Sequence, residues 1–238
     1  MKKIDGRVKT IVTVSHFATD IVRPRAKLAK SLGADIIMMM PPYHGALLKG
    51  NQDQIYKQFS KVSEIDIPIM IQDAPLSGIE LPVPFLTKMI NEIENLTCFK
   101  IESANAASKI RALIKNCSSR LDAPFDGEES ITLYADLEAG ISGSMSSALL
   151  PEKIAPVIDL FWNNEKDKSE EIYNNILPLI NFENRQCGFR ATKTVMKEGG
   201  VIKSDFCRDP IKPLDQDTKK LLLNFAKRYD LLTYKWGK

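Results

Sequence analysis

One lysine in this 238-residue sequence is placed to act as a nucleophile. A mainly apolar stretch, 93–99, leads directly into Lys100, and Glu102 follows two positions later. A lysine at the end of a buried strand is costly to keep charged, because desolvation favours the neutral amine. The neutral amine is the form that attacks a carbonyl carbon to make a Schiff base. The alternative is a lysine whose stem packs at the strand end while its ammonium group reaches solvent.

A second strand ends in polar residues shortly before this lysine. The stretch 68–73 is apolar until Gln72 and Asp73. Successive strands that deliver polar residues at their carboxyl ends are how an α/β barrel builds an active site. This arrangement favours the Schiff-base interpretation of Lys100.

Strand-like and helix-like stretches alternate over the first two thirds of the chain, which is typical of parallel βαβ units. We predict six strands, at 10–15, 34–40, 68–73, 97–102, 120–125 and 141–145. The helices between them are predicted at 25–32, with Pro24 in the first turn, and at 52–65, 84–93, 104–116 and 130–139. Beyond Pro151 the pattern predicts only helices, at 151–162, 167–180, 187–198 and 215–231.

Six parallel strands fit two architectures. A doubly wound sheet would carry a glycine-rich phosphate turn, and neither GxGxxG nor GxxxxGK[ST] occurs in the sequence. A (β/α)₈ barrel needs eight strands, which is two more than the pattern shows. The residue pattern alone leaves both architectures open.

The composition is that of an ordinary globular protein. A net charge of +3 with scattered basic residues gives no patch for nucleic acid. No apolar run approaches the roughly 18 residues of a membrane span, and the first residues lack a signal-peptide core. The four cysteines form no CxxC pair, and His16 and His44 are the only histidines. We therefore expect no metal site, no cofactor, reduced thiols and a cytoplasmic location.

Four motifs, taken in their order and spacing, resemble the dihydrodipicolinate synthase / N-acetylneuraminate lyase family. They are the stretch 33–43 with its Pro-Pro-Tyr end, the strand 68–75, Phe99-Lys100, and the stretch 140–152. The resemblance covers nearly the whole chain. It implies a class I, Schiff-base-forming aldolase or lyase on a TIM barrel. Residues 1–160 would form a partial barrel that lacks the first two βα units, and residues 161–238 a C-terminal helical extension.

The resemblance also implies a set of site residues. Lys100 stands at the family's Schiff-base lysine, at the end of the sixth barrel strand. Tyr43 stands at the first tyrosine of a Pro-Tyr-Tyr loop and would act in catalysis, whereas His44 replaces the second tyrosine. Gly143 and Ser144 match the segment beside the bound keto acid. Gly143, Ser144 and His44 are expected to bind substrate.

The sequence departs from the family in three places. The first two βα units and the Gly-Thr-Thr-Gly-Glu loop that binds a carboxylate have no counterpart. Gln72 occupies the position of the tyrosine that relays protons, and an amide has no titratable proton. We expect Gln72, with Asp73, to bind substrate instead. Ser77 lies about where synthases carry a substrate-binding arginine, which argues against a dicarboxylate-like second substrate.

We therefore expect a homo-oligomeric aldolase or lyase that acts on a 2-oxo acid such as pyruvate through an imine at Lys100, with activity impaired by the missing strands. One alternative is an inactive or truncated family member with a binding or assembly role. Another is an unrelated α/β sheet with a ligand at its strand ends. Glu102 is expected to be a salt-bridged supporting group, and the acidic loop 126–129 to be solvated.

Overall fold

The computed structural model describes residues 2–45, 47–74, 77–117 and 120–238, and the structural statements below concern these ranges. The chain divides into two compact units. The first comprises Met1–Glu128 and Glu138–Ser144, and the second comprises Glu129–Leu137 and Met145–Lys238. The boundary expected at residue 160 stays a prediction.

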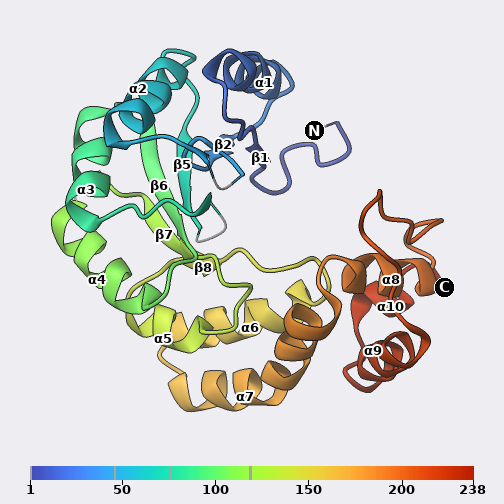
Figure 1. The fold of residues 1–238 in the computed structure, drawn as a ribbon. Helices are drawn as coiled ribbons and strands as arrows, with labels where there is room; N and C mark the ends of the chain where they lie inside the picture. The colour runs from blue at the N-terminus through green and yellow to red at the C-terminus, as the bar shows by residue number, and fades with distance from the viewer. Residues whose placement is uncertain (1, 46, 75–76, 118–119) are drawn as a thin grey trace. The chain divides into compact units, whose positions relative to one another are not determined.

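A six-stranded parallel sheet forms the centre of the first unit (Figure 1). Its strands, in spatial order, are β1 (Ile11–Thr13), β2 (Ile36–Met39), β5 (Ile69–Asp73), β6 (Leu96–Ile101), β7 (Ala123–Asp126) and β8 (Gly143–Ser144). Spatial order follows chain order and every pairing in this sheet is parallel, as in a row of successive βαβ units. The six predicted strands are confirmed, although β7 ends one residue later than expected.

Four helices of the first unit lie along one face of this sheet (Figure 1). They are α1 (Thr19–Ser31), α2 (Gln52–Ser63), α3 (Val83–Glu92) and α4 (Ala106–Cys117). Each buries an apolar stripe, with Phe59 of α2 and Leu86 of α3 fully enclosed. The inner strands are buried on both sides, which explains their continuous runs of Ile and Met.

The first helix corrects one prediction. α1 begins at Thr19 rather than at residue 25, so Pro24 lies inside the helix and not in its first turn. The prediction relied on the preference of proline for the first helical position. Here the chain gives up one hydrogen bond at Pro24, while Val22, Ala26 and Ala29 of the same helix are buried.

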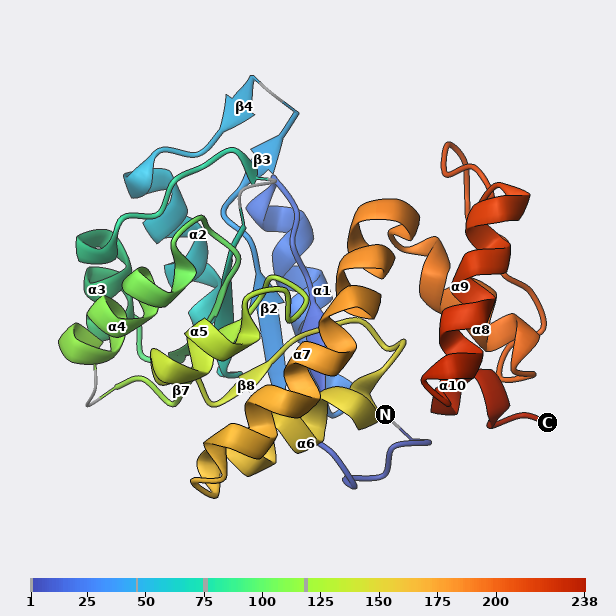
Figure 2. The ribbon, with the colours of Figure 1, turned by 90° about the horizontal axis from the view of Figure 1, so that it is seen from below.

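A short hairpin follows β2 and was not predicted. Its strands, β3 (Tyr43–His44) and β4 (Leu48–Lys49), pair antiparallel. Figure 2 shows them apart from the six-stranded sheet. Strands of two residues carry no readable alternation, which is why this segment resembles a loop in the sequence.

The second unit is helical, as predicted. It contains most of α5 (Leu133–Glu138), followed by α6 (Pro151–Trp162), α7 (Lys166–Phe182), the π-helix η2 (Glu183–Cys187), α8 (Arg190–Glu198), α9 (Gln216–Arg228) and α10 (Leu232–Lys235). Tyr173 fixes α7 by donating to the carbonyl oxygen of Ile131 at 2.6 Å. No helix within the described ranges has the length and apolar character needed to cross a membrane.

Candidate functional site

Lys100 lies near the carboxyl end of β6, in a row of residues that crosses four strands. Gln72 of β5 and Phe125 of β7 are its partners in register, and Phe125 is in turn opposite Gly143 of β8. Residues in register project to the same face of a sheet. The structure thus brings Gln72 and Lys100 together as expected, and Lys100 is buried with 8% of its surface exposed.

Glu102 connects these two side chains. Lys100 Nζ forms an ion pair with Glu102 Oε1, and Gln72 Nε2 donates to the same oxygen at 2.7 Å. The side chains of Lys100 and Glu102 are only 10% and 13% exposed, so water screens their interaction weakly. The expected salt bridge of Glu102 is present. Its partner is the candidate nucleophile, which the sequence interpretation had not foreseen.

Asp73 is held by a second lysine. Its carboxylate is buried and lies 2.5 Å from Lys109 Nζ of α4. Burial raises the pKa of Asp73, and the ammonium group of Lys109 partly opposes that rise. The main-chain oxygen of Asp73 accepts the N–H of Glu102 at 2.8 Å. Asp73 therefore supports the position of Glu102 through its main chain, while Lys109 engages its carboxylate.

The segment after β7 packs against Lys100 and Glu102. The expectation that the acidic loop 126–129 is solvated is therefore wrong. Asp126 and Gly127 are both buried. Asp126 Oδ2 accepts the hydroxyl proton of Ser144 at 2.6 Å. A Cβ atom at Gly127 would lie 2.4 Å from Glu102 Cγ and 3.0 Å from Lys100 Cγ. Because β7 extends to Asp126, this acidic residue belongs to the sheet, in register with Ile101 of β6 and Ser144 of β8, and not to a loop.

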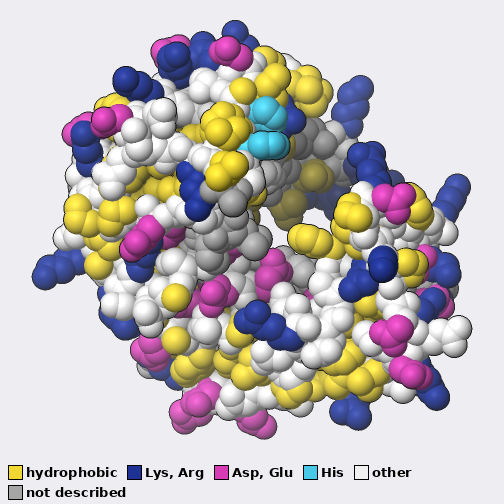
Figure 3. Space-filling view, viewed as in Figure 1, with side chains coloured by type: hydrophobic (Ala, Val, Ile, Leu, Met, Phe, Trp, Pro, Cys, Tyr) yellow, Lys and Arg dark blue, Asp and Glu magenta, His cyan; other side chains and the backbone are white. Residues whose placement is uncertain are grey.

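Tyr43 and His44 lie on the hairpin, outside the row that contains Lys100. Tyr43 is half-buried and His44 is exposed. Figure 3 shows histidine at the surface beside apolar side chains. Lys49 Nζ of the same hairpin donates to the carbonyl oxygen of Gly78 at 2.8 Å, which links the hairpin to the segment after β5. The roles expected for Tyr43 and His44 stay predictions.

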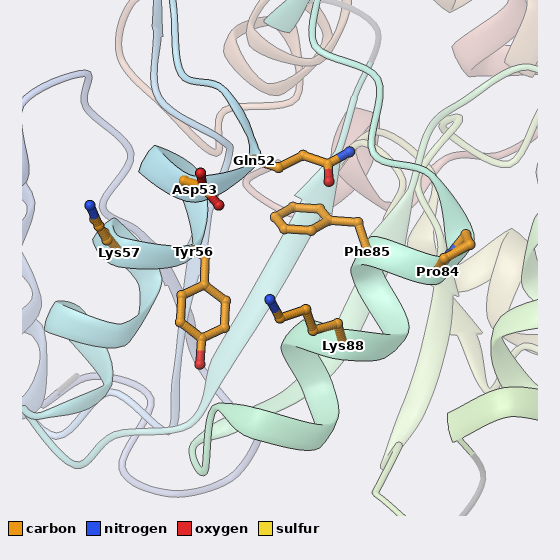
Figure 4. Close-up of a pocket in the computed structure, with 7 residues that line it drawn as sticks. All are labelled: Gln52, Asp53, Tyr56, Lys57, Pro84, Phe85 and Lys88. Atoms are coloured by element: carbon orange, nitrogen blue, oxygen red, sulfur yellow. The ribbon is translucent and has the colours of Figure 1, made fainter.

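A pocket of about 330 Å³ lies between α2 and α3 (Figure 4). Tyr56, Phe85 and Lys88 are among its lining residues, and Lys88 Nζ is 5.1 Å from the centre of the Tyr56 ring. At that distance the ammonium group makes a cation–π contact. The described residues that line this pocket come from the two helices, so it is separate from the strand-end group around Lys100.

Cys98 shares β6 with Lys100 but has no nucleophilic character. Its thiol is buried, and burial raises its pKa to about 12. The thiolate is the reactive form of cysteine, so Cys98 is a packing residue. Over the described ranges, no three His, Cys, Asp or Glu side chains gather as a metal site.

Comparison with known proteins identifies the family. The model of the dihydrodipicolinate synthetase family matches residues 1–228. The L-2-keto-3-deoxyarabonate dehydratase of Azospirillum brasilense is 44% identical over 238 residues, which are 100% of this chain and 77% of that protein. The crystal structure of dihydrodipicolinate synthase from Aquifex aeolicus superposes with a TM-score of 0.87 at 24% identity, covering 96% of this chain and 77% of that one.

A structure described as the first monomeric dihydrodipicolinate synthase variant matches with a TM-score of 0.86 at 23% identity, over 97% of this chain and 77% of that one. These likenesses confirm a TIM-barrel type of fold, of which the described sheet is a part with six strands. The chain belongs to the dihydrodipicolinate synthetase family and is a lyase-type enzyme of the class I aldolase kind.

Proposed function

We propose that this enzyme is a dehydratase of a 2-keto-3-deoxy sugar acid and that it forms an imine between Lys100 and the keto carbon of its substrate. The observation that carries the proposal is the contact of Glu102 with both Lys100 and Gln72. Glu102 supplies a carboxylate beside Gln72, which stands at the position of the expected tyrosine. The 44% identity to a dehydratase of such an acid supports the same reaction class.

The contact suits imine formation. Attack on the keto carbon needs the neutral amine, and the ion pair gives the Lys100 ammonium a direct path for its proton to Glu102. The amine then bonds to C2, and the former keto oxygen leaves as water. Gln72 cannot exchange a proton at neutral pH. Its amide instead orients the carboxylate oxygen that lies against Lys100.

Elimination follows from the same geometry. The protonated imine withdraws electrons from C3, so Glu102 can take the C3 proton and leave an enamine. The electron pair then expels the C4 hydroxyl, which departs as water with the proton that Glu102 returns. A C3–C4 double bond forms, and water hydrolyses the imine to restore Lys100. One carboxylate thus acts as base and then as acid.

The remaining expected site residues are proposed as substrate contacts at the strand ends and the hairpin: Gln72, Asp73, His44, Gly143 and Ser144. For Ser144 the contact would have to use its lone pairs or its main chain. A hydroxyl donates a single proton, and that of Ser144 is donated to Asp126. Tyr43 is proposed to line the site from the hairpin.

Three further features are proposed from the resemblance. β1 would correspond to the third strand of an eight-stranded barrel, which makes β6 the sixth. The protein would be a cytoplasmic homo-oligomer, although a monomeric variant exists among its structural relatives. It would act on a small-molecule 2-oxo acid without a metal or cofactor.

Borohydride trapping tests the imine. The protein is incubated with L-2-keto-3-deoxyarabonate or with pyruvate, reduced, and mapped by peptide mass spectrometry. We expect the adduct on Lys100 and none on Lys109, whose side chain is similarly shielded at 14% exposure. Lys100→Arg should give no adduct and no loss of water from the sugar acid, followed by NMR. Turnover in Lys100→Arg, or adducts spread over several lysines, would contradict the proposal.

A further inference from the structure

The carboxylate of Asp126 is enclosed at the end of β7, with 0% of the residue exposed. Its Oδ2 accepts the hydroxyl of Ser144 at 2.6 Å, and its Oδ1 accepts the N–H of Glu128 at 2.8 Å. A buried carboxylate is tolerated only where hydrogen bonds replace its lost hydration. Bonds to a charged acceptor are short and strong. Asp126 therefore ties the last residue of β8 to the turn that follows β7.

That turn touches the reacting side chains through Gly127. The N–H of Gly127 donates to the carbonyl oxygen of Ile101 at 2.9 Å. The place where a Cβ would stand is 2.4 Å from Glu102 Cγ and 3.0 Å from Lys100 Cγ. The main chain at Gly127 thus forms a wall against the stems of both side chains. If the turn moved outward, Lys100 and Glu102 would gain freedom to rotate.

We infer that Asp126 and Ser144 form a positioning pair, which fixes the Gly127 wall and through it the relative placement of Lys100 Nζ and the Glu102 carboxylate. The inference rests on the proposed function, because it assigns the reaction to Lys100 and Glu102. The pair acts through geometry. Asp126 contributes through its hydrogen bonds to Ser144 and Glu128 and takes no part in the chemistry.

A positioning role has a kinetic signature that a purely structural role lacks. Asp126→Ala should lower kcat by about 10- to 100-fold, because a misplacement of about 1 Å can cost about 100-fold. KM should change far less in this variant, since Asp126 itself makes no substrate contact in this scheme. Asp126→Asn should recover most of kcat, because its amide oxygen can accept the Glu128 N–H while its NH₂ group donates to Ser144.

A double-mutant cycle tests whether the two residues act together. Ser144→Ala should lower kcat in the same direction, and Asp126→Ala/Ser144→Ala should be no worse than Asp126→Ala alone. Ser144→Ala also serves if Asp126→Ala does not fold, as thermal unfolding will show. Full additivity, wild-type kcat in a folded Asp126→Ala or Ser144→Ala, or equal impairment in Asp126→Asn and Asp126→Ala would overturn the inference.

Hydrogen exchange separates this inference from the proposed function. Loss of the pair should speed amide exchange in the peptide that spans 126–130, in both single variants, whether or not the enzyme traps a 2-oxo acid. An absent Lys100 adduct in the wild type would refute the imine proposal alone. Unchanged exchange at 126–130 in both variants would refute the positioning pair, whatever the trapping result.

Discussion

Gln72 donates its amide hydrogen to the Glu102 carboxylate at 2.7 Å. The resemblance places a proton-relaying tyrosine at the position of Gln72, and a glutamine cannot replace its chemistry. The structure shows a carboxylate beside the amide, and that carboxylate also contacts Lys100. The group able to move protons is therefore on the segment after β6, while β5 supplies the group that orients it.

Glu102→Gln tests this assignment. The amide keeps the size of the side chain and removes its titratable proton, so turnover should fall by about 10²- to 10⁴-fold. The borohydride adduct on Lys100 should still form, although more slowly. Glu80→Gln, an exposed position of the same unit, is the control and should keep its turnover. A Glu102→Gln enzyme within a few-fold of wild type would remove Glu102 from the mechanism.

Tyr43→Phe discriminates between the two candidates for proton relay. If Tyr43 were the relay, loss of its hydroxyl would lower turnover by about 10²- to 10⁴-fold. Because Glu102 contacts Lys100 directly and Tyr43 lies on the hairpin, we expect a decrease of less than about tenfold. Steady-state kinetics of Tyr43→Phe and Glu102→Gln, measured side by side, compare the two losses of turnover. A larger loss in Tyr43→Phe than in Glu102→Gln would return the relay to the tyrosine.

The strand order was predictable because each buried strand has a recognisable local pattern in the sequence, a short apolar run between helical stretches. Lys100 was found for the same reason, as a charged residue that ends such a run. Contacts between residues that the strand register brings together have no recognisable pattern in the local sequence. The approach of Gly127 to Glu102 joins segments on different strands, and Lys109 reaches Asp73 from a helix 36 residues away in sequence. An Asp-Gly-Glu-Glu segment resembles a solvated turn until β7 is seen to include Asp126.

Gly127→Ala should damage the site directly. The added Cβ would meet Glu102 Cγ at 2.4 Å and the Ile101 carbonyl oxygen at 2.9 Å, so the turn or Glu102 must shift. Overpacking of this kind typically costs about 1–3 kcal/mol of stability, and turnover should fall as well. Gly143→Ala is the comparison for stability, because among the described residues its Cβ would meet the Phe125 ring alone, at 3.0 Å. Denaturant unfolding should rank Gly127→Ala as the more harmful. The reverse order would contradict the wall described above.

Lys109→Met should destabilise the first unit by leaving the Asp73 carboxylate buried without its lysine. Removal of one partner from a buried ion pair typically costs about 3–5 kcal/mol. Because burial already raises the pKa of Asp73 and Lys109 opposes this, the pKa should rise further in the variant. Asp73→Asn/Lys109→Met should recover part of the loss. Urea unfolding of wild type, Lys109→Met, Asp73→Asn and the double variant measures the recovery, and purely additive effects would mean that the pair is not coupled.

Glu183, in the second unit, makes stability depend on pH. The first residue of η2, it is buried and accepts hydrogen bonds from Ser147 and, at 3.3 Å, from Thr192. Burial raises its pKa from 4.5 to about 7. The Ser147 hydroxyl opposes that rise, whereas the nearby Glu129 carboxylate adds to it. The folded state therefore holds a proton that the unfolded state releases at lower pH.

This contribution to stability is fully present below about pH 4.5, the unfolded value, and is lost as pH rises toward and through about 7. At about 1.4 kcal/mol per pH unit of displacement, the loss is on the order of 2–3 kcal/mol between pH 5 and pH 8. Glu183→Gln mimics the protonated form and should lose this dependence, so it should gain stability over wild type as pH rises. Urea unfolding of wild type, Glu183→Gln and the exposed control Glu170→Gln at both pH values measures the difference. Parallel pH profiles for wild type and Glu183→Gln would show that Glu183 does not titrate in this range, because only its carboxyl distinguishes the two proteins.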